Sequence, residues 1–415
     1  MENPKIRFKG FTKDWEQRKL GDIINEYKET VDSDCILPIL TSSKTEGVIL
    51  QEEHFGRKQQ HDITGYNILP RNYCTYRNRS DGVDFTFNIN KCCDKGIISK
   101  FYPVFSGKNS DVFFLSLVLN NSEEVVREIA YTCTGTGQKV LSFLDLQKMK
   151  VRVPNFDEQK EIAAYFESLD HLITLHQRKC DQTKNLKKYM LQKMFPQNGA
   201  KVPEIRFDGY TYDWEQRKLG ELVKEGILEA PLDGNHGEKH PTSDEYVDSG
   251  IPFLMASDIH NGEVNIYSCK YITKERAERL DKGFARNGDV LLTHKATIGE
   301  TAILSNLMTE YAMLTPQVTY YRIKNEERLN REYLYSFFNS LDFQTELKTK
   351  AAQSTRPYIG ITAQQNLKII LPAEINEQIR IGLYFRNLDH LITLHQRKCD
   401  ELKKMKKYML QNMFI

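Results

Sequence analysis

The sequence predicts an α+β fold, in which two globular domains of mixed α/β structure are joined by two long helices that pair as an antiparallel, pseudo-twofold coiled coil. Three observations predict it. At 415 residues the chain is too long for one ordinary core. Two different segments are each written twice, 199 and 219 positions apart. One of these repeated segments spaces its apolar residues in heptads, as coiled-coil helices do.

The two repeats frame two segments that differ from each other. PKIRFKGFTKDWEQRKLGDI (4–23) and PEIRFDGYTYDWEQRKLGEL (203–222) are identical at 14 of 20 positions and contain both Trp residues. Segments 169–195 and 388–414 are identical at 22 of 27 positions, and both begin LDHLITLHQRKCD. The segments between the repeats, about 24–150 and 223–366, hardly resemble each other. The chain is therefore a duplicated unit whose two middle parts have diverged.

Each copy of the second repeat is expected to lie in one long helix. A short apolar strand stops at Pro154 or Pro372, and Asp157 and Asn376 are the expected N-caps, because short polar side chains accept hydrogen bonds from free helix N–H groups. No Pro or Gly interrupts the first copy before Phe195, which allows about 38 residues, on the order of 57 Å. The expected segments are a domain at 1–153, a helix at 154–198, a domain at 199–371 and a helix at 372–415.

The apolar residues of both helices form a heptad stripe that includes one histidine in each copy. We expect this stripe to be the seam along which the helices pack. The paired histidines would fix the register or bind a metal, and we expect no metal because no carboxylate or thiol is arranged with them. The expected pairing residues are Ile162, Phe166, Leu169, Ile173, His176, Met190, Ile381, Phe385, Leu388, Ile392, His395, Leu402 and Met409.

Charge is concentrated locally. The net charge is only +2, so a nucleic-acid binder must gather its basic residues on one surface. The second half of each helix is rich in Lys and Arg. This basic segment is either a solvated helix end or a surface for a nucleic-acid backbone or an acidic partner, and the sequence leaves both open.

The expected cellular location rests on the lack of a membrane span and of a secretory signal in the sequence. No stretch approaches the ~18–20 apolar residues of a membrane span, and MENPKIRFKG lacks the apolar core of a secretory signal. None of the eight cysteines forms a C-x-x-C pair, so we expect free thiols. The expected location is the cytoplasm.

The first variable segment contains LPRNYCTYRNRSDG (69–82), which combines Arg and Asn with a closing Asp–Gly turn. Arg and Asn can make bidentate contacts to guanine and adenine edges. GRKQQHD (56–62) is a second polar run, and CTGTGQKVL (133–141) places a Lys after a glycine-rich turn. The expected DNA-binding residues here are Lys58, Gln59, Gln60, His61, Arg71, Arg77, Asn78, Arg79, Ser80 and Lys139.

The second variable segment offers three polar loops, in DGNHGEKHPTSDEY (233–246), RNGDVLLTHKATIGE (286–300) and QSTRPYIG (353–360). In the middle one, the strand DVLL runs into the loop. RNYCTYRNRSDG and RNGDVLLTHKATIG are therefore predicted to be equivalent strand–loop elements that carry different polar residues. The expected DNA-binding residues here are Asn235, His236, Lys239, Thr293, His294, Lys295, Thr297, Ser354, Thr355 and Arg356.

Motifs that would indicate an enzyme are missing. There is no Asn/Asp-Pro-Pro motif for base methylation, no Walker A lysine and no H-E-x-x-H. A dispersed nuclease carboxylate cluster would leave no mark in the sequence, so this class stays open. A binding protein fits better than an enzyme.

The chain as a whole resembles the specificity (S) subunits of type I restriction–modification systems. The resemblance rests on DWEQRKLG written twice, on PNFDEQKEI and PAEINEQIRI before the long helices, and on LDHLITLHQRK within them. IPFLMASDIHNGEV and GDVLLTHKATIGE also look like segments of that family's target-recognition domains. CTGTGQKVLSFLDL and STRPYIGITAQQNL, which hold corresponding places, share almost nothing. This difference fits two domains of different specificity.

The resemblance implies a non-catalytic subunit of a bacterial complex that works on double-stranded DNA. Each recognition domain would read one half of a bipartite, asymmetric site, and the helices would set the spacing and dock two methyltransferase subunits. Restriction/translocase subunits would complete the complex. S-adenosylmethionine, ATP and Mg are expected only on these partners, and the chain itself needs no cofactor. The alternative is a duplicated scaffold that recruits two identical partners without touching DNA.

Overall fold

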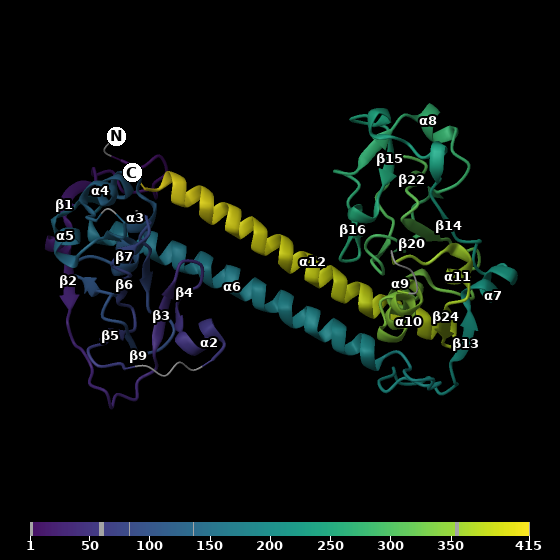
Figure 1. Cartoon of the computed structure of the whole chain (residues 1–415), viewed down its shortest axis with the longest axis horizontal. Helices are drawn as coiled ribbons and strands as arrows, with labels where there is room; N and C mark the ends of the chain where they lie inside the picture. Colours follow the sequence, from purple (N-terminus) through teal and green to yellow (C-terminus); the bar gives the residue numbers. More distant parts are fainter. Residues whose placement is uncertain (1–2, 58–61, 83, 136, 353–356, 415) are drawn as a thin grey trace. The chain divides into compact units, whose positions relative to one another are not determined.

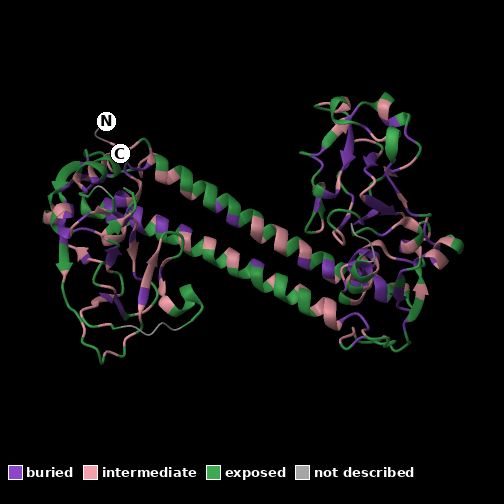
Figure 2. Cartoon of the chain, viewed as in Figure 1, coloured by how far each residue is buried: buried purple, intermediate pink, exposed green. Residues whose placement is uncertain are grey.

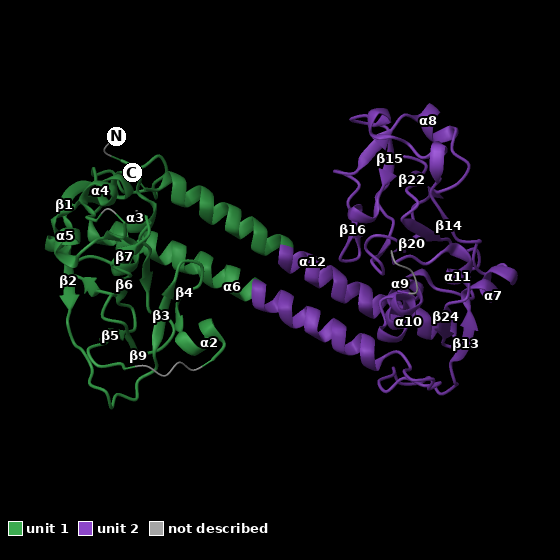
Figure 3. Ribbon diagram, in the orientation of Figure 1, with its two compact units in different colours: residues 1–176, 397–415 green, residues 177–396 purple. Residues whose placement is uncertain are grey.

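A computed structural model describes residues 3–57, 62–82, 84–135, 137–352 and 357–414. The chain forms two compact units (Figure 3). Unit 1 consists of residues 1–176 and 397–415, and unit 2 of residues 177–396. Each unit therefore contains one globular domain and half of each long helix, which differs from the four separate segments expected from the sequence.

The long helices are α6 (Phe156–Lys193) and α12 (Ile375–Asn412), of 38 residues each (Figure 1). The predicted N-caps are wrong by two residues, since α6 begins at Phe156 and α12 at Ile375. Asn155 caps α6, since its Oδ1 accepts a hydrogen bond from the backbone N of Glu158 at 3.0 Å. Asp157 and Asn376 lie inside the first helical turns, where Asp157 favours the positive end of the helix dipole instead.

The two helices pack antiparallel in both units. In unit 1, Lys406 pairs with Asp170 at 2.6 Å, and the Cys399 thiol lies 4.0 Å from the Ile173 carbonyl. In unit 2, Lys187 pairs with Asp389 at 2.6 Å, and the Cys180 thiol lies 3.8 Å from the Ile392 carbonyl. Residue numbers rise along α6 as they fall along α12. The predicted fold class, two α/β domains joined by an antiparallel helix pair, is confirmed.

Along both long helices, the residues of the heptad stripe are buried or partly buried (Figure 2). Of the expected pairing residues, seven are buried: Ile162, Phe166, Leu169, Ile381, Phe385, Leu388 and Leu402. The remaining six are partly buried: Ile173, His176, Met190, Ile392, His395 and Met409. Within the described ranges, none of the helices carries an apolar stretch long enough to span a bilayer.

Each globular domain contains a four-stranded sheet, and the two sheets correspond to each other. In unit 1 the strand order is β2-β10-β6-β8, and in unit 2 it is β14-β23-β20-β21. The strands of the first sheet are Ile24–Tyr27, Val104–Gly107, Cys74–Tyr76 and Phe87–Ile89. Those of the second are Leu232–Asp233, Val318–Tyr321, Val290–Thr293 and Thr301–Ile303. The helices after the sheets are α3 (Val112–Asn121) and α4 (Glu123–Thr132) in unit 1, and α9 (Arg331–Phe338) and α10 (Leu341–Ala351) in unit 2.

What is added to this shared sheet differs between the units. Unit 2 has a second four-stranded sheet, β18-β15-β22-β19 (Lys270–Ile272, Ile251–Leu254, Ala312–Leu314, Phe284–Ala285), with a ribbon of β16 and β17 (Ile259–His260, Glu263–Val264) and helix α8 (Lys274–Glu278). Unit 1 has the pairs β3-β4 (Leu40–Ser43, Gly47–Leu50), β5-β9 (Asn67–Pro70, Lys95–Ile98) and β11-β7 (Lys139–Val140, Arg79–Ser80), and helix α2 (Gln51–Phe55). The two variable segments of the sequence thus differ mainly in the strands and helices that they add to the common four-stranded sheet.

The repeated DWEQRKLG segment forms the same strand and helix in both units. β1 (Glu16–Lys19) pairs antiparallel with β12 (Lys150–Val153), and β13 (Glu215–Lys218) pairs with β24 (Lys368–Leu371) in the same register. The following helices, α1 (Leu20–Ile23) and α7 (Leu219–Lys224), lie against α5 (Phe143–Lys148) and α11 (Ile361–Gln365). A Cβ added at Gly21 or Gly220 would lie 3.1 Å from the carbonyl oxygen of Gln147 or Gln365. This contact is tight, so a side chain at either glycine would require the neighbouring helix to shift by a few tenths of an ångström.

The repeated Arg and Glu–Gln residues also make equivalent contacts. Arg7 forms a bidentate ion pair with the buried Glu158, at 2.6 and 2.7 Å. Arg206 pairs with the buried Glu377 at 2.7 and 2.8 Å. Removing one partner would leave a buried charge uncompensated, which typically costs about 3–5 kcal/mol. These pairs tie each PxIRF segment to the first turn of a long helix.

The far end of each long helix packs into the domain of the other repeat. In unit 1, Phe414 of α12's end lies 6.5 Å from the ring of Trp15 and 6.0 Å from that of Phe166. In unit 2, Phe195 lies 6.3 Å from Trp214 and 5.7 Å from Phe385. Each helix end must therefore fit the frame around a tryptophan, which is why the YMLQ-x-MF segment and the Trp segment are repeated together.

Candidate nucleic-acid interface

The strand–loop elements that the sequence paired are equivalent. β6 of RNYCTYRNRSDG and β20 of RNGDVLLTHKATIG are both third in their sheets, so this prediction is confirmed. The loops that follow them start in the same way. The backbone N of Asn78 donates to Phe101 O at 2.9 Å, and Asn78 O accepts from Leu141 N at 3.0 Å. His294 makes the matching bonds to Gln317 and Ile359, at 2.9 and 3.2 Å. Asn78 and His294 therefore hold the same position.

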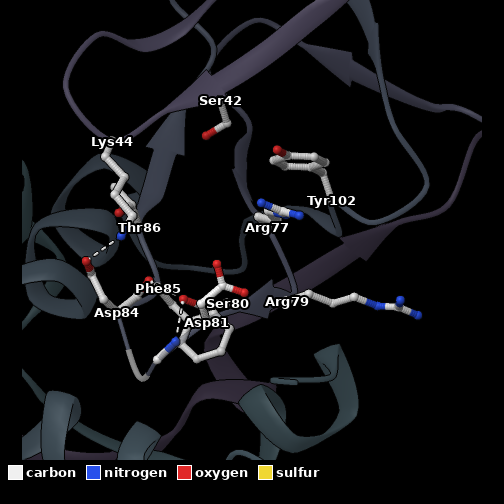
Figure 4. A pocket seen from close by; sticks show the side chains of 11 residues that line it. Ser42, Lys44, Arg77, Arg79, Ser80, Asp81, Asp84, Phe85, Thr86 and Tyr102 are labelled. Carbon is white, nitrogen blue, oxygen red and sulfur yellow. Dashed lines mark hydrogen bonds and ion pairs between the residues drawn. The ribbon is translucent and has the colours of Figure 1, made fainter. Parts of the chain in front are cut away.

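A hollow of about 410 Å³ opens beside the loop of unit 1 (Figure 4). Three expected DNA-binding residues line it: Arg77, Arg79 and Ser80. The Arg77 side chain lies beside the ring of Tyr102, and Arg79 extends away from both (Figure 4), with its guanidinium 4.5 Å from the ring centroid of Phe101. Both arginines are exposed. Their charges are therefore accessible to an anionic ligand.

Other expected residues of unit 1 fall into two groups. Lys139 is brought to this loop, because β11 pairs with β7 and sets Lys139 opposite Ser80. Arg71 is not. Arg71 precedes β6, whereas Arg77 follows this strand. The Arg71 side chain pairs with Asp94 at 2.8 Å and donates a hydrogen bond to Lys91 O at 3.0 Å. Arg71 is thus separated from the other basic residues by the length of a strand.

The corresponding loop of unit 2 borders a hollow of about 230 Å³. Lys295 is exposed and lines it together with His240, Met255, Thr315, Pro316 and Gln317. Thr297 is exposed on the same loop. Thr293, in contrast, is fully buried, and its Oγ1 accepts a hydrogen bond from Glu300 N at 3.0 Å. The expectation that Thr293 contacts DNA is corrected, because its hydroxyl serves the fold.

The loop at 233–246 is held by its own polar residues. Asn235 is buried, donates to Lys282 O at 2.8 Å and accepts from Asp281 N at 3.2 Å. His236 contacts Asp233 at 2.9 Å, and Lys239 pairs with Asp281. The expectation for Asn235 is therefore also corrected. His236 and Lys239 remain exposed, but each already has an acidic partner.

His294 is buried as well, so its predicted contact with DNA is corrected too. Burial lowers the pKa of its imidazole to about 4, against the opposing attraction of Asp233. Neither ring nitrogen has a hydrogen-bond partner among the described residues. The ring lies 5.5 Å from that of Tyr358. At neutral pH the group is an uncharged part of the core.

Seven expected DNA-binding residues lie outside the described residues: Lys58, Gln59, Gln60, His61, Ser354, Thr355 and Arg356. Three residues that line the hollows were not predicted from the sequence: Lys44, Tyr102 and Gln317. Lys44 lies in the hairpin TSSKTEG between β3 and β4, and this turn was a readable signal. Tyr102 and Gln317 lie beside the sites only because of strand order, which the sequence does not spell out.

A second candidate surface lies on the long helices. In each unit four apolar side chains, exposed by 36–58%, come from equivalent positions of the two helices. The unit 1 patch consists of Leu172, Leu175, Met405 and Tyr408. The unit 2 patch consists of Leu391, Leu394, Leu186 and Tyr189.

Heptad geometry groups the residues of each patch on one side of the seam. Leu172 directly precedes the seam residue Ile173, and Met405 directly precedes Lys406, which pairs with α6. On antiparallel helices, residues that precede the seam residue lie on the same side of the pair. The two patches have nearly the same composition, so they suit two copies of one partner.

Comparison with known proteins gives a consistent family. The chain matches the model of the type I restriction modification DNA specificity domain twice, over residues 12–185 and 212–404. The MjaVIII type I restriction enzyme specificity subunit of Methanocaldococcus jannaschii is 24% identical over 327 residues, covering 76% of this chain and 73% of the relative. The EcoBI specificity subunit of Escherichia coli is 24% identical over 262 residues, covering 59% and 52%. The crystal structure of an S subunit from M. genitalium shares the fold, with a TM-score of 0.62 at 12% identity over 100% of this chain and 99% of that one.

Proposed function

Because this chain belongs to the family of type I restriction–modification DNA specificity proteins, we propose that it is the non-catalytic reader of a bipartite, asymmetric DNA site. Each globular domain binds one half-site through the loop that follows β6 or β20. The observation that carries this proposal is that a hollow borders each of the two equivalent loops and is lined by an exposed cation of that loop. The loops around them differ, as two different half-sites require.

The helices supply the rest of the function. We propose that the unit 1 and unit 2 patches dock two methyltransferase subunits, and that the length of the helix pair sets the spacing of the half-sites. Restriction/translocase subunits then join the complex. S-adenosylmethionine, ATP and Mg belong to these partners, and the complex works on DNA in the cytoplasm. The near identity of the two patches supports docking of two identical subunits.

Binding to a random DNA duplex across a salt series tests the proposal. The full chain is combined with its methyltransferase subunits, and fluorescence anisotropy of the labelled duplex gives the association constant. Each phosphate contact contributes a slope of about −0.9 in log K against log salt, so we expect a clearly steeper slope for the complex than for the methyltransferase subunits alone. The same slope with and without the chain would favour the scaffold that only recruits partners.

A further inference from the structure

The two hollows have one position in common. Asn78 and His294 are equivalent by their backbone hydrogen bonds, so the residues that follow them, Arg79 and Lys295, are equivalent too. The ladder beside the loops agrees. Arg79 pairs with Val140, and Lys295 forms an antiparallel bridge with Tyr358. Val140 directly precedes Leu141, which bonds Asn78, and Tyr358 directly precedes Ile359, which bonds His294. Arg79 lines the hollow of unit 1 and Lys295 that of unit 2.

The neighbouring positions are not shared. Arg77, which is exposed, corresponds to the buried Thr293, and Ser80 corresponds to Ala296. The cation at the common position is therefore kept while the residues on either side of it change.

The cation at the common position is also uncompensated. Arg79 and Lys295 are exposed, and neither forms an ion pair within the described ranges. Other lysines near the same loops are neutralised: Lys44 pairs with Asp84 at 2.5 Å, and Lys239 pairs with Asp281. The common position thus presents a free positive charge in both units.

Two half-sites of an asymmetric DNA sequence differ in their bases but have the same phosphate backbone. A side chain that reads a base has no reason to be repeated in a domain that reads other bases. A side chain that holds a phosphate does, because phosphate contacts position the protein and carry no sequence information. A lysine ammonium is a compact point charge without the planar fork that suits a guanine edge.

Resting on the proposed function, we propose that Arg79 and Lys295 are equivalent phosphate anchors, each binding a backbone phosphate of its own half-site. They fix how each loop sits on the duplex and do not choose its sequence. Sequence choice in unit 1 then belongs to residues without an equivalent in unit 2, with Arg77 foremost.

The test uses R79Q, K295Q and the double variant in the full chain bound to its methyltransferase subunits. Association with a duplex carrying the recognised site, and with a random duplex, is measured by anisotropy between about 50 and 200 mM salt. We expect each single variant to reduce the magnitude of the slope of log K against log salt by about 0.9, and the double variant by about 1.8. Affinity should fall by the same factor on both duplexes, and the methylated sequence should not change.

K148Q and K274Q are the matched controls, because each removes a lysine of the same domain that already has an acidic partner and lines neither hollow. They should keep the wild-type slope. The inference is overturned if R79Q and K295Q keep that slope as well, or if either variant alters which half-site sequence is methylated. A wild-type slope no steeper than that of the partner subunits alone would instead remove the proposed function, and the inference with it.

Discussion

Burial, rather than any charged neighbour, sets the pKa of His294. The imidazole is fully buried between Asp233 and Tyr358, and its pKa is lowered from 6.5 to about 4. His236 and Lys295 lower it further, while Asp233 opposes them. Between pH 6.5 and pH 4 the unfolded chain binds a proton at this residue that the folded chain does not. The contribution of His294 to stability is therefore complete above pH 6.5 and is lost as the pH falls towards 4.

Replacing His294 by Asn, the residue at the equivalent position of unit 1, should remove this pH dependence. Over 2.5 pH units the effect amounts to about 3 kcal/mol of the free energy of unfolding. Urea unfolding followed by Trp fluorescence, at several pH values, measures it for the wild type and H294N. Carboxylates also titrate between pH 6.5 and pH 4. The effect of His294 is therefore the difference in the free energy of unfolding between the wild type and H294N at each pH. Parallel pH profiles would contradict the burial argument.

The sequence predicted the long helices well because their information is local. The heptad spacing of both helices, and the absence of Pro and Gly from α6, are properties of the segments themselves, and α6 has the expected length. The equivalent strand–loop elements were also predicted, since a strand followed by a polar loop leaves a readable pattern.

The site was harder to predict because burial depends on tertiary packing. Asn235, Thr293 and His294 are polar residues of two polar-looking segments, yet all three are buried. The same reason hid Tyr102 and Gln317, which reach the hollows from the segments that lead into β10 and β23, the strands beside β6 and β20. Polar composition marked the right loops but did not tell which of their side chains face outward.

At the scale of the helices, the two apolar patches predict how many partners bind. Replacing Tyr408 by Glu places a charge in the unit 1 patch, and Tyr189→Glu does the same in the unit 2 patch. Burying an unpaired charge at a docking surface costs on the order of 2 kcal/mol or more, so each single variant should bind one methyltransferase subunit, and the double variant none. Native mass spectrometry of the reconstituted complex counts them.

Leu383→Glu is the matched control for these variants. Leu383 is 47% exposed and lies on α12, outside both patches. It should keep two bound subunits. If Y408E and Y189E also keep two, the docking surface lies elsewhere on the chain.

Across the whole molecule, the repeated and the unrepeated segments have different structural roles. Three sets of repeated residues make equivalent contacts in both units: the close approach at Gly21 and Gly220, the buried arginine–glutamate pairs, and the phenylalanines against Trp15 and Trp214. Each copy of LDHLITLHQRKCD forms part of the seam and supplies two leucines to the patch of its unit. The unrepeated segments carry the loops that we propose to read DNA.

The central claim is that the two domains read their half-sites independently. Exchanging residues 24–150 for the corresponding segment of another family member, and then sequencing the methylated adenines of host DNA, tests this most directly. We predict that one half of the bipartite methylated sequence changes, while the other half and the spacing between them stay the same. A change in both halves, or in neither, would contradict the account.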